Sequence, residues 1–151
     1  MSELVLVTGV GPGTGKAIVE CFAVNGYAVA MIARSEQRLN EISESTPNTH
    51  PFVCDVADEA RLSAVLEEIR NSLGAPKIVI HNAVGAERGT YLEVDAQKMR
   101  AAFEINTMAL LSLAKQLIPD MEAAGGGALI ATGNTSAYRG KARFAGFAPT
   151  K

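Results

Sequence analysis

The sequence lacks several features that would indicate particular classes of protein. It has no run of like charges and a net charge of only −2 over 151 residues, so nothing indicates a nucleic acid or an anionic membrane as a partner. No apolar stretch approaches the length of a membrane span. The opening residues, MSELVLV, include an acid and run into a short strand pattern rather than a signal peptide. We therefore expect a cytoplasmic protein.

Cysteine is scarce as well. Cys21 and Cys54 each lie in an apolar stretch, so we expect two reduced thiols in the core, with a disulfide or a shared metal ion as the alternative. The composition, 48% hydrophobic and 20% charged, is that of an ordinary globular protein. A chain of this length suffices for one domain with its own core.

Short apolar runs alternate with longer amphipathic runs along the chain. The apolar runs are rich in Val, Ile, Leu and Ala and predict parallel strands at 4–8, 28–33, 51–54, 77–81 and 128–132. The amphipathic runs predict helices near 13–25, 35–44, 58–73 and 96–124. This alternation predicts an α/β fold, a doubly wound parallel sheet in a single domain over residues 1–151.

A glycine-rich turn, TGVGPGTGK, follows the first predicted strand. It does not fit the phosphate loop GxxxxGK[ST], because Val10 and Ala17 stand at two required positions, and GxGxxG fails in register. Gly9, Gly13 and Gly15 instead follow the spacing GxxxGxG. Such a turn lets the backbone approach a diphosphate while a helix N-terminus faces its charge. The alternative is a turn that only packs the helix close to the sheet.

Two residues at strand ends bear on the choice of dinucleotide. Arg34 stands where a site that prefers NAD carries an acid for the ribose hydroxyls. An arginine can instead clamp a 2′-phosphate, which favours NADP(H), with NAD(H) as the second choice and a merely solvated arginine as the alternative. Asp55, at the end of the third strand, can accept a hydrogen bond from the adenine amino group.

Asn106 lies on the apolar stripe of the long predicted helix. The other members of that stripe are Met99, Phe103, Leu110, Leu113, Ala114, Leu117 and Met121. A buried amide costs about 1–3 kcal/mol unless its groups are paired. Asparagine also competes with helical hydrogen bonds, so we expect it to loosen the helix here and to hold a water. The alternative is a satisfied core asparagine without a chemical role.

These motifs, in this order and spacing, resemble the short-chain dehydrogenase/reductase family along the whole chain. The family's TGxxxGxG, its Asp after strand three and its helical Asn match the glycine turn, Asp55 and Asn106. Its NNAG after strand four is HNAV here, and Val84 adds a branched side chain beside the nicotinamide ribose. The resemblance implies a Rossmann-type sheet of order 3-2-1-4-5 with the C-terminal strands missing, and hence the N-terminal portion of a longer chain.

The family carries out its reaction with YxxxK and a serine thirteen residues before the tyrosine. Lys151 matches the lysine, which in the family lowers the pKa of the tyrosine and binds the nicotinamide ribose. Phe147 stands at the tyrosine position and Asn134 at the serine position. Phenylalanine has no proton to give, whereas an amide can still donate a hydrogen bond to an oxyanion. Tyr138, the one phenol nearby, is expected on the surface, with a swing into the cleft as the alternative.

The resemblance thus implies an oxidoreductase that moves hydride between NADP(H) and a small carbonyl or alcohol substrate. The catalytic candidates are Asn106, Asn134 and Lys151. The candidates for cofactor binding are Gly9, Gly11, Gly13, Thr14, Gly15, Arg34, Ser35, Asp55, Val56, Asn82, Ala83, Val84 and Lys151. No metal, nucleic acid or membrane is expected, and the family's packing of helix 96–124 against its copy implies a homodimer or homotetramer.

Two other functions remain open. Phe147 and Asn134 favour a non-catalytic dinucleotide-binding protein, such as a sensor or a pseudoenzyme subunit. A flavodoxin-like domain that binds another phosphate ligand would share the strand count, although it would not explain the motif after strand four or Asn106.

Overall fold

The apolar runs of the sequence form one parallel sheet in the computed structural model, which describes residues 2–151. The strands are β1 (Leu4–Thr8), β2 (Ala28–Ala33), β3 (Thr49–Val53), β4 (Ile78–His81) and β5 (Ala128–Ala131). Their order in the sheet is β3-β2-β1-β4-β5, which confirms the predicted order. β1 is the central strand and is buried along its whole length. The chain reverses its direction of travel across the sheet between β1 and β4, and such a point leaves a crevice at the carboxyl ends of the strands.

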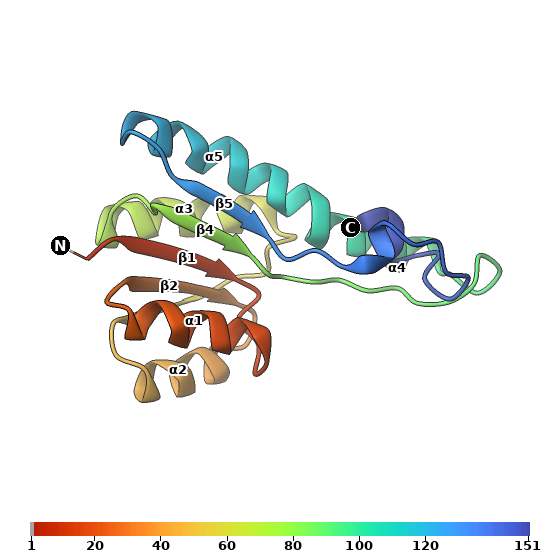
Figure 1. Ribbon diagram of the computed structural model, residues 1–151, viewed down its shortest axis with the longest axis horizontal. Coiled ribbons are helices and arrows are strands. Elements are labelled where there is room, and N and C mark those ends of the chain that lie inside the picture. Colours follow the sequence, from red (N-terminus) through yellow and green to blue (C-terminus); the bar gives the residue numbers. More distant parts are fainter. Residues whose placement is uncertain (1) are drawn as a thin grey trace.

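Amphipathic helices cover both faces of the sheet, as the doubly wound fold requires (Figure 1). The helices α1 (Thr14–Val24) and α2 (Glu36–Ser45) pack on one face, where Val19, Leu39 and Ile42 join a core with β1 and β2. The helices α3 (Glu59–Leu73), α4 (Ala96–Phe103) and α5 (Ala109–Ala123) lie on the other side, and α3 and α5 contribute to the second core. No helix within residues 2–151 is long and apolar enough to cross a membrane.

The long helix predicted at 96–124 is widened at Asn106. Five residues of π-helix, Glu104–Met108, join α4 to α5, which confirms that the helix loosens at this asparagine. One extra residue in a turn rotates the upstream part by about 100°. The buried stripe therefore runs through Ala102 instead of Phe103, which is 39% exposed. The predicted burial of Phe103 is wrong for this reason.

The two cysteines differ in burial. Cys54 is buried and burial raises the pKa of its thiol to about 11, so it remains protonated. Cys21 is exposed, and the prediction of a core position for it is wrong. It lies two residues after Val19, a buried residue of α1, and therefore faces the opposite side of that helix. Both thiols are free, as expected.

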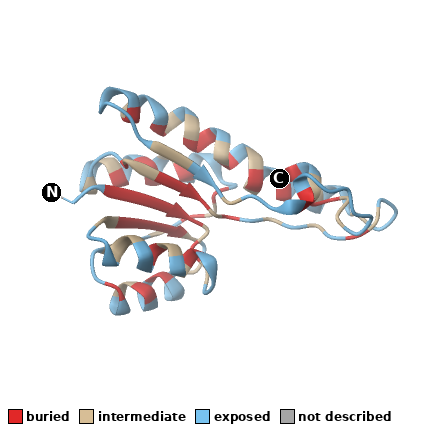
Figure 2. Cartoon of the chain, in the orientation of Figure 1, coloured by how far each residue is buried: buried red, intermediate tan, exposed pale blue. Residues whose placement is uncertain are grey.

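Two loop segments extend beyond the carboxyl ends of β4 and β5. We call residues 84–95 and 138–147 together the arm. The two segments lie side by side through a parallel bridge between Gly89 and Phe144, where Gly89 N donates to Arg143 O at 3.0 Å and Ala145 N donates to Gly89 O at 3.2 Å. Figure 2 shows that the arm is largely exposed, in contrast to the sheet. A short 3-10 helix, Ala148–Thr150, then leads back to Lys151 beside the sheet.

Candidate functional site

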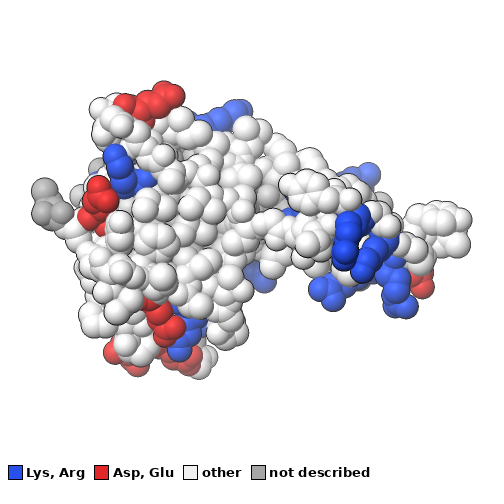
Figure 3. Space-filling model, viewed as in Figure 1, with Lys and Arg blue, Asp and Glu red and all other residues white. Residues whose placement is uncertain are grey.

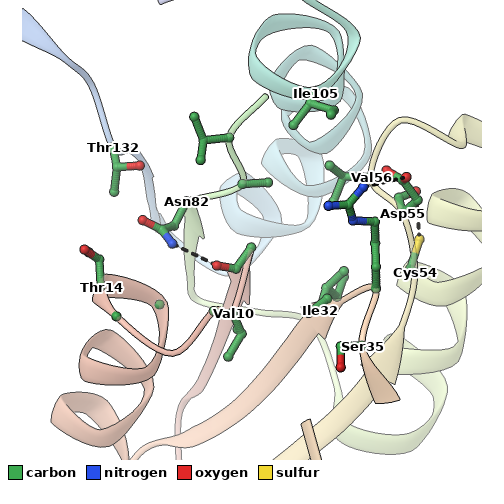
Figure 4. A pocket seen from close by; sticks show the side chains of 18 of the residues that line it. Val10, Thr14, Ile32, Ser35, Cys54, Asp55, Val56, Asn82, Ile105 and Thr132 are labelled. Atoms are coloured by element: carbon green, nitrogen blue, oxygen red, sulfur yellow. Dashed lines mark hydrogen bonds and ion pairs between the residues drawn. The ribbon is translucent and has the colours of Figure 1, made fainter. Parts of the chain in front are cut away.

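A cleft of about 650 Å³ lies at the carboxyl ends of the strands, where the strand order reverses. In Figure 4, Thr14 and Thr132 lie on one side of it and Asp55 and Val56 on the other. All thirteen residues predicted to bind a cofactor line this cleft, and so does Asn134. Sequence reasoning missed Arg38, Cys54 and Ile105 as lining residues. Arg38 could have been found, since it lies one helical turn after Arg34 at the start of α2.

The glycine turn has two distinct parts. Gly9 has a positive φ of 70°, and a Cβ there would lie 2.3 Å from the backbone of Ala83. A Cβ on Gly15 would lie 2.6 Å from the carbonyl oxygen of Gly9. By contrast, Cβ atoms on Gly11 and Gly13 would meet nothing within 4 Å. The missing side chains of Gly9 and Gly15 therefore permit close packing of α1 and the loop after β4. Gly11 and Gly13 instead leave open backbone along the cleft.

The end of α1 is arranged to receive an anion. No side chain caps the N-terminus of this helix, where Gly13 is the N-cap residue. The uncapped N–H groups and the helix dipole together favour a phosphate group. Asn82 fixes the turn from the other side, because its Nδ2 donates to Gly9 O at 2.9 Å (Figure 4). The packing explanation and the phosphate explanation of the turn thus apply to different glycines.

The part of the cleft beside the end of β2 is lined by positively charged side chains. Arg34 is 76% exposed in its side chain, and its Nη1 lies 3.9 Å from Asp55 Oδ2. So long and exposed an ion pair contributes at most about 1 kcal/mol, so the guanidinium can turn toward a ligand at little cost. Arg38 lines the same end, and Ser35 caps α2 through Arg38 N at 3.3 Å.

Asn106 does not line the cleft, but it forms hydrogen bonds to two segments that border it. Its Oδ1 accepts from Gly85 N at 2.8 Å, and its Nδ2 donates to Gly85 O and to Thr150 Oγ1, both at 2.8 Å. Thr107 Oγ1 also donates to Thr150 O at 3.1 Å. Asn106 therefore holds the loop after β4 and the residue before Lys151 in one arrangement. Its amide is satisfied by groups of the protein, and the expectation that it holds a water stays a prediction.

Lys151, Phe147 and Asn134 all line the cleft. Lys151 Nζ donates to Thr132 O at 3.2 Å, and burial lowers the pKa of this lysine below its usual value. Phe147 is buried, whereas Tyr138 is 92% exposed and lies away from the cleft, as expected for a surface tyrosine. Asn134 Oδ1 accepts from Ser136 N at 2.9 Å, which leaves the Nδ2 group as its hydrogen-bond donor toward a ligand.

His81 links the sheet to the π-helical segment. Its Nε2 lies 2.9 Å from Ile105 O and its Nδ1 2.9 Å from Thr8 Oγ1. A carbonyl oxygen only accepts, so we assign the proton to Nε2 and let the Thr8 hydroxyl donate to Nδ1. Burial lowers the pKa of His81, which keeps the ring neutral in this arrangement. The neutral ring thereby fixes Ile105, which lines the cleft.

This burial predicts a pH-dependent loss of stability. Between the lowered pKa of folded His81 and the ordinary value of about 6.5, the unfolded chain binds more protons than the folded chain. The free energy of unfolding should therefore fall as the pH drops below about 6.5, and level off below the folded pKa. His81→Asn should flatten this part of the curve in urea denaturation, whereas His50→Asn should retain it because His81 is still present. Identical curves for both variants would show that His81 is not the group responsible.

Comparison with known proteins agrees with this geometry. Among curated proteins, the chain is 28% identical over 134 residues to sulfoacetaldehyde reductase 2 of Chromohalobacter salexigens, covering 86% of this chain and 53% of the relative. It is 32% identical over 116 residues to the NADPH-dependent 3-dehydrocapnine reductase of Ornithobacterium rhinotracheale, covering 75% of this chain and 41% of the relative. The chain thus spans about half the length of the curated relatives it matches.

Solved structures show the same likeness. The L-sorbose reductase of Gluconobacter frateurii, in complex with NADPH and L-sorbose, superposes with a TM-score of 0.91 at 30% identity, covering 99% of this chain and 59% of the reductase. The family model described as short chain dehydrogenase matches residues 3–151. With the sheet order and the cleft at its reversal point, this match shows that the chain belongs to the short chain dehydrogenase family.

Proposed function

We propose that the chain is the cofactor-binding part of an oxidoreductase that transfers hydride between NADP(H) and a carbonyl or alcohol substrate. The observation that carries the proposal is the cleft itself. It joins an open glycine turn and an uncapped helix N-terminus at one point to Lys151 and Asn134 at another. A dinucleotide needs this combination, a diphosphate cradle with a reacting centre some distance away.

The residues present fit the cofactor. Gly11 and Gly13 leave room for a diphosphate against the backbone, which a Cβ would occupy. Arg34 and Arg38 would hold a 2′-phosphate, and Asp55 would accept from the adenine amino group. Lys151, held by Thr132 O and by the Asn106–Thr150 contact, would bind the nicotinamide ribose. The cofactor itself would supply the hydride acceptor or donor.

The chemistry left to the protein is modest. Asn134 Nδ2 would donate to the substrate oxygen and stabilise negative charge that develops there. Phe147 has no proton to donate, so the proton added in a reduction would come from solvent. Hydride added to the carbonyl carbon and a proton added to its oxygen give the alcohol and the oxidised cofactor. Because no general acid stands at position 147, we expect slow turnover.

One observation favours a second function, a dinucleotide-binding protein without turnover. Phe147 is buried at the cleft, and no tyrosine of residues 2–151 lines that cleft.

A homo-oligomer and a cytoplasmic location also belong to the proposal. The first is supported by exposed apolar side chains on the π-helical segment and on α4 and α5, namely Phe103, Met108, Leu111 and Ile118.

The preference for NADP(H) is tested by replacing Arg34 with glutamine. Hydrogen bonds to charged groups contribute about 1.5–3 kcal/mol, so calorimetry should show NADPH binding weakened about tenfold to a hundredfold. NADH binding should be unchanged, because NADH has no 2′-phosphate. Arg61→Gln, an exposed arginine of α3 outside the cleft, is the control and should bind both cofactors as the unmodified chain does. Equal losses for NADPH and NADH, or tighter NADH binding before any change, would contradict the assignment.

A further inference from the structure

The cleft wall beside the end of β5 presents two hydrogen-bond donors. Lys151 Nζ donates to Thr132 O at 3.2 Å, which leaves an ammonium group two further protons, one for the nicotinamide ribose and one for another acceptor. Asn134 Oδ1 accepts from Ser136 N, so the Nδ2 group is the part of this amide left for a ligand. Thr132 and Asn134 are two residues apart, a span of at most about 7 Å. Both donors therefore belong to one short segment of the wall.

The ionisable acceptor of the cleft lies far from these donors. Within residues 2–151 the cleft is lined by one carboxylate, that of Asp55, which follows β3. β3 and β5 are the two edge strands of the sheet, so their ends lie about 19 Å apart at a strand spacing of about 4.8 Å. Figure 4 shows Asp55 and Thr132 on opposite sides of the cleft. Asp55 is therefore too distant to take a proton from a substrate held beside Lys151.

The polar groups closer to β5 are poor proton acceptors. His81 does not line the cleft, and both of its ring nitrogens are engaged in hydrogen bonds. Burial, and less strongly the charge of Lys151, lowers the pKa of His81 and so keeps a second proton off the ring. Thr132 and Asn82 offer neutral oxygens, which accept hydrogen bonds but hold no proton near neutral pH. Phe147 offers neither nitrogen nor oxygen in its side chain.

The charge visible on the surface has the same bias. On the face shown in Figure 3, most of the Asp and Glu side chains lie over the sheet and its helices. Lys and Arg side chains predominate beyond the carboxyl ends of the strands, where the cleft opens. This part of the cleft thus combines donors with little nearby negative charge on the visible face.

We propose that Asn134 Nδ2 and Lys151 Nζ together bind an oxygen that carries negative charge, and that the substrate is therefore a carbonyl compound and not an alcohol. In a reduction, hydride adds to the carbonyl carbon, the electron pair of the C=O π bond moves to the oxygen, and the two donors hold the resulting alkoxide until water protonates it. The reverse reaction starts from a neutral alcohol, which the same donors hold less tightly because hydrogen bonds to an ionised oxygen are stronger. This inference rests on the proposed function, since it assigns the substrate class of that site.

The test measures which form of one ligand the site binds. 4-Nitrophenol is titrated at several pH values into the full-length protein saturated with NADP⁺, and visible absorbance distinguishes the phenolate from the phenol. We expect the phenolate to bind at least about tenfold more tightly, because two donors, one of them charged, face its oxygen. Asn134→Asp retains an acceptor for Ser136 N but replaces the donor with a second acceptor, so it should abolish or reverse the preference.

A matched variant separates this effect from a general change in charge. Asn71→Asp, at an exposed position of α3 outside the cleft, adds the same negative charge and should keep the preference for the phenolate. Equal affinity for phenol and phenolate, or a preference that survives Asn134→Asp, overturns the inference. If 4-nitrophenol does not bind, calorimetry with acetate decides: binding that Asn134→Asp abolishes supports the oxyanion site, and absence of heat refutes it.

The proposed function is measured separately, as NADPH oxidation by carbonyl compounds. Carbonyl reduction without a preference for the phenolate would leave the proposed function intact and remove the inference. A phenolate preference that depends on Asn134, in a protein that reduces no carbonyl compound, would instead support the oxyanion site and count against the oxidoreductase.

Discussion

Replacing Phe147 with tyrosine is expected to raise kcat for carbonyl reduction by about 10²–10⁴-fold in the full-length protein. Phe147 is buried at the cleft, and Lys151 lines the same cleft four residues later. A phenol at this position could give a proton to the substrate oxygen, and general acid catalysis contributes a factor of that size. The measurement is NADPH oxidation against a panel of carbonyl compounds. The gain should appear in kcat rather than in KM for NADPH, because the contact is made to the reacting oxygen.

Phe144→Tyr is the matched control for this change. Phe144 lies in the arm and contacts Phe147 but does not line the cleft, so a hydroxyl added there should leave kcat unchanged. A gain in both variants would point to a change in the arm instead of a proton donor. No gain from Phe147→Tyr, with NADPH still bound tightly, would favour the dinucleotide-binding protein without turnover over the oxidoreductase.

Replacing Gly9 with alanine is expected to cost several kcal/mol of stability and to abolish NADPH binding. The residue has a φ of 70°, and the left-handed region costs about 1–2 kcal/mol for a residue with a Cβ. The new atom would also lie 2.3 Å from the Ala83 backbone, and overpacking costs about 1–3 kcal/mol more. Relief of that clash must displace the loop after β4, which also lines the cleft. Urea denaturation and calorimetry with NADPH measure the two effects.

Gly11→Ala separates packing from cofactor binding in the same turn. Its Cβ would meet nothing within 4 Å, so the free energy of unfolding should change by no more than about 0.5 kcal/mol. The methyl group would nevertheless stand near the expected diphosphate and weaken NADPH binding. If Gly11→Ala destabilised the fold as much as Gly9→Ala, the division of the turn into a packing part and a cradle would be wrong.

The fold and most of the cleft could be predicted from the sequence because both depend on local patterns. Near-continuous apolar runs identified the five strands within two residues of their observed ends. The carboxyl ends of parallel strands meet at one edge of the sheet, so residues that follow the strands, such as Arg34, Asp55 and Asn82, had to lie close together. The loosening of the helix at Asn106 could be expected because asparagine competes with helical hydrogen bonds, whereas its form as a π-helical segment was not predicted.

Two predictions failed because they depended on which side of a helix faces the core. Phe103 was misplaced because the π-helical segment shifts the buried stripe by one residue, and Cys21 because an apolar stretch does not reveal which side of a helix faces the core. The partners of Asn106, Gly85 and Thr150, lie 21 and 44 residues away, so no local pattern could identify them.

The order of strands and helices along the chain, the glycine-rich turn and the phenylalanine at position 147 were therefore determined by the sequence alone, since each depends on residues that are neighbours in the chain. The tertiary structure decided which glycines are needed for packing and which histidine tautomer joins the sheet to the helix. These depend on contacts between segments far apart in sequence, which form only when the hydrophobic core brings the strands and loops together.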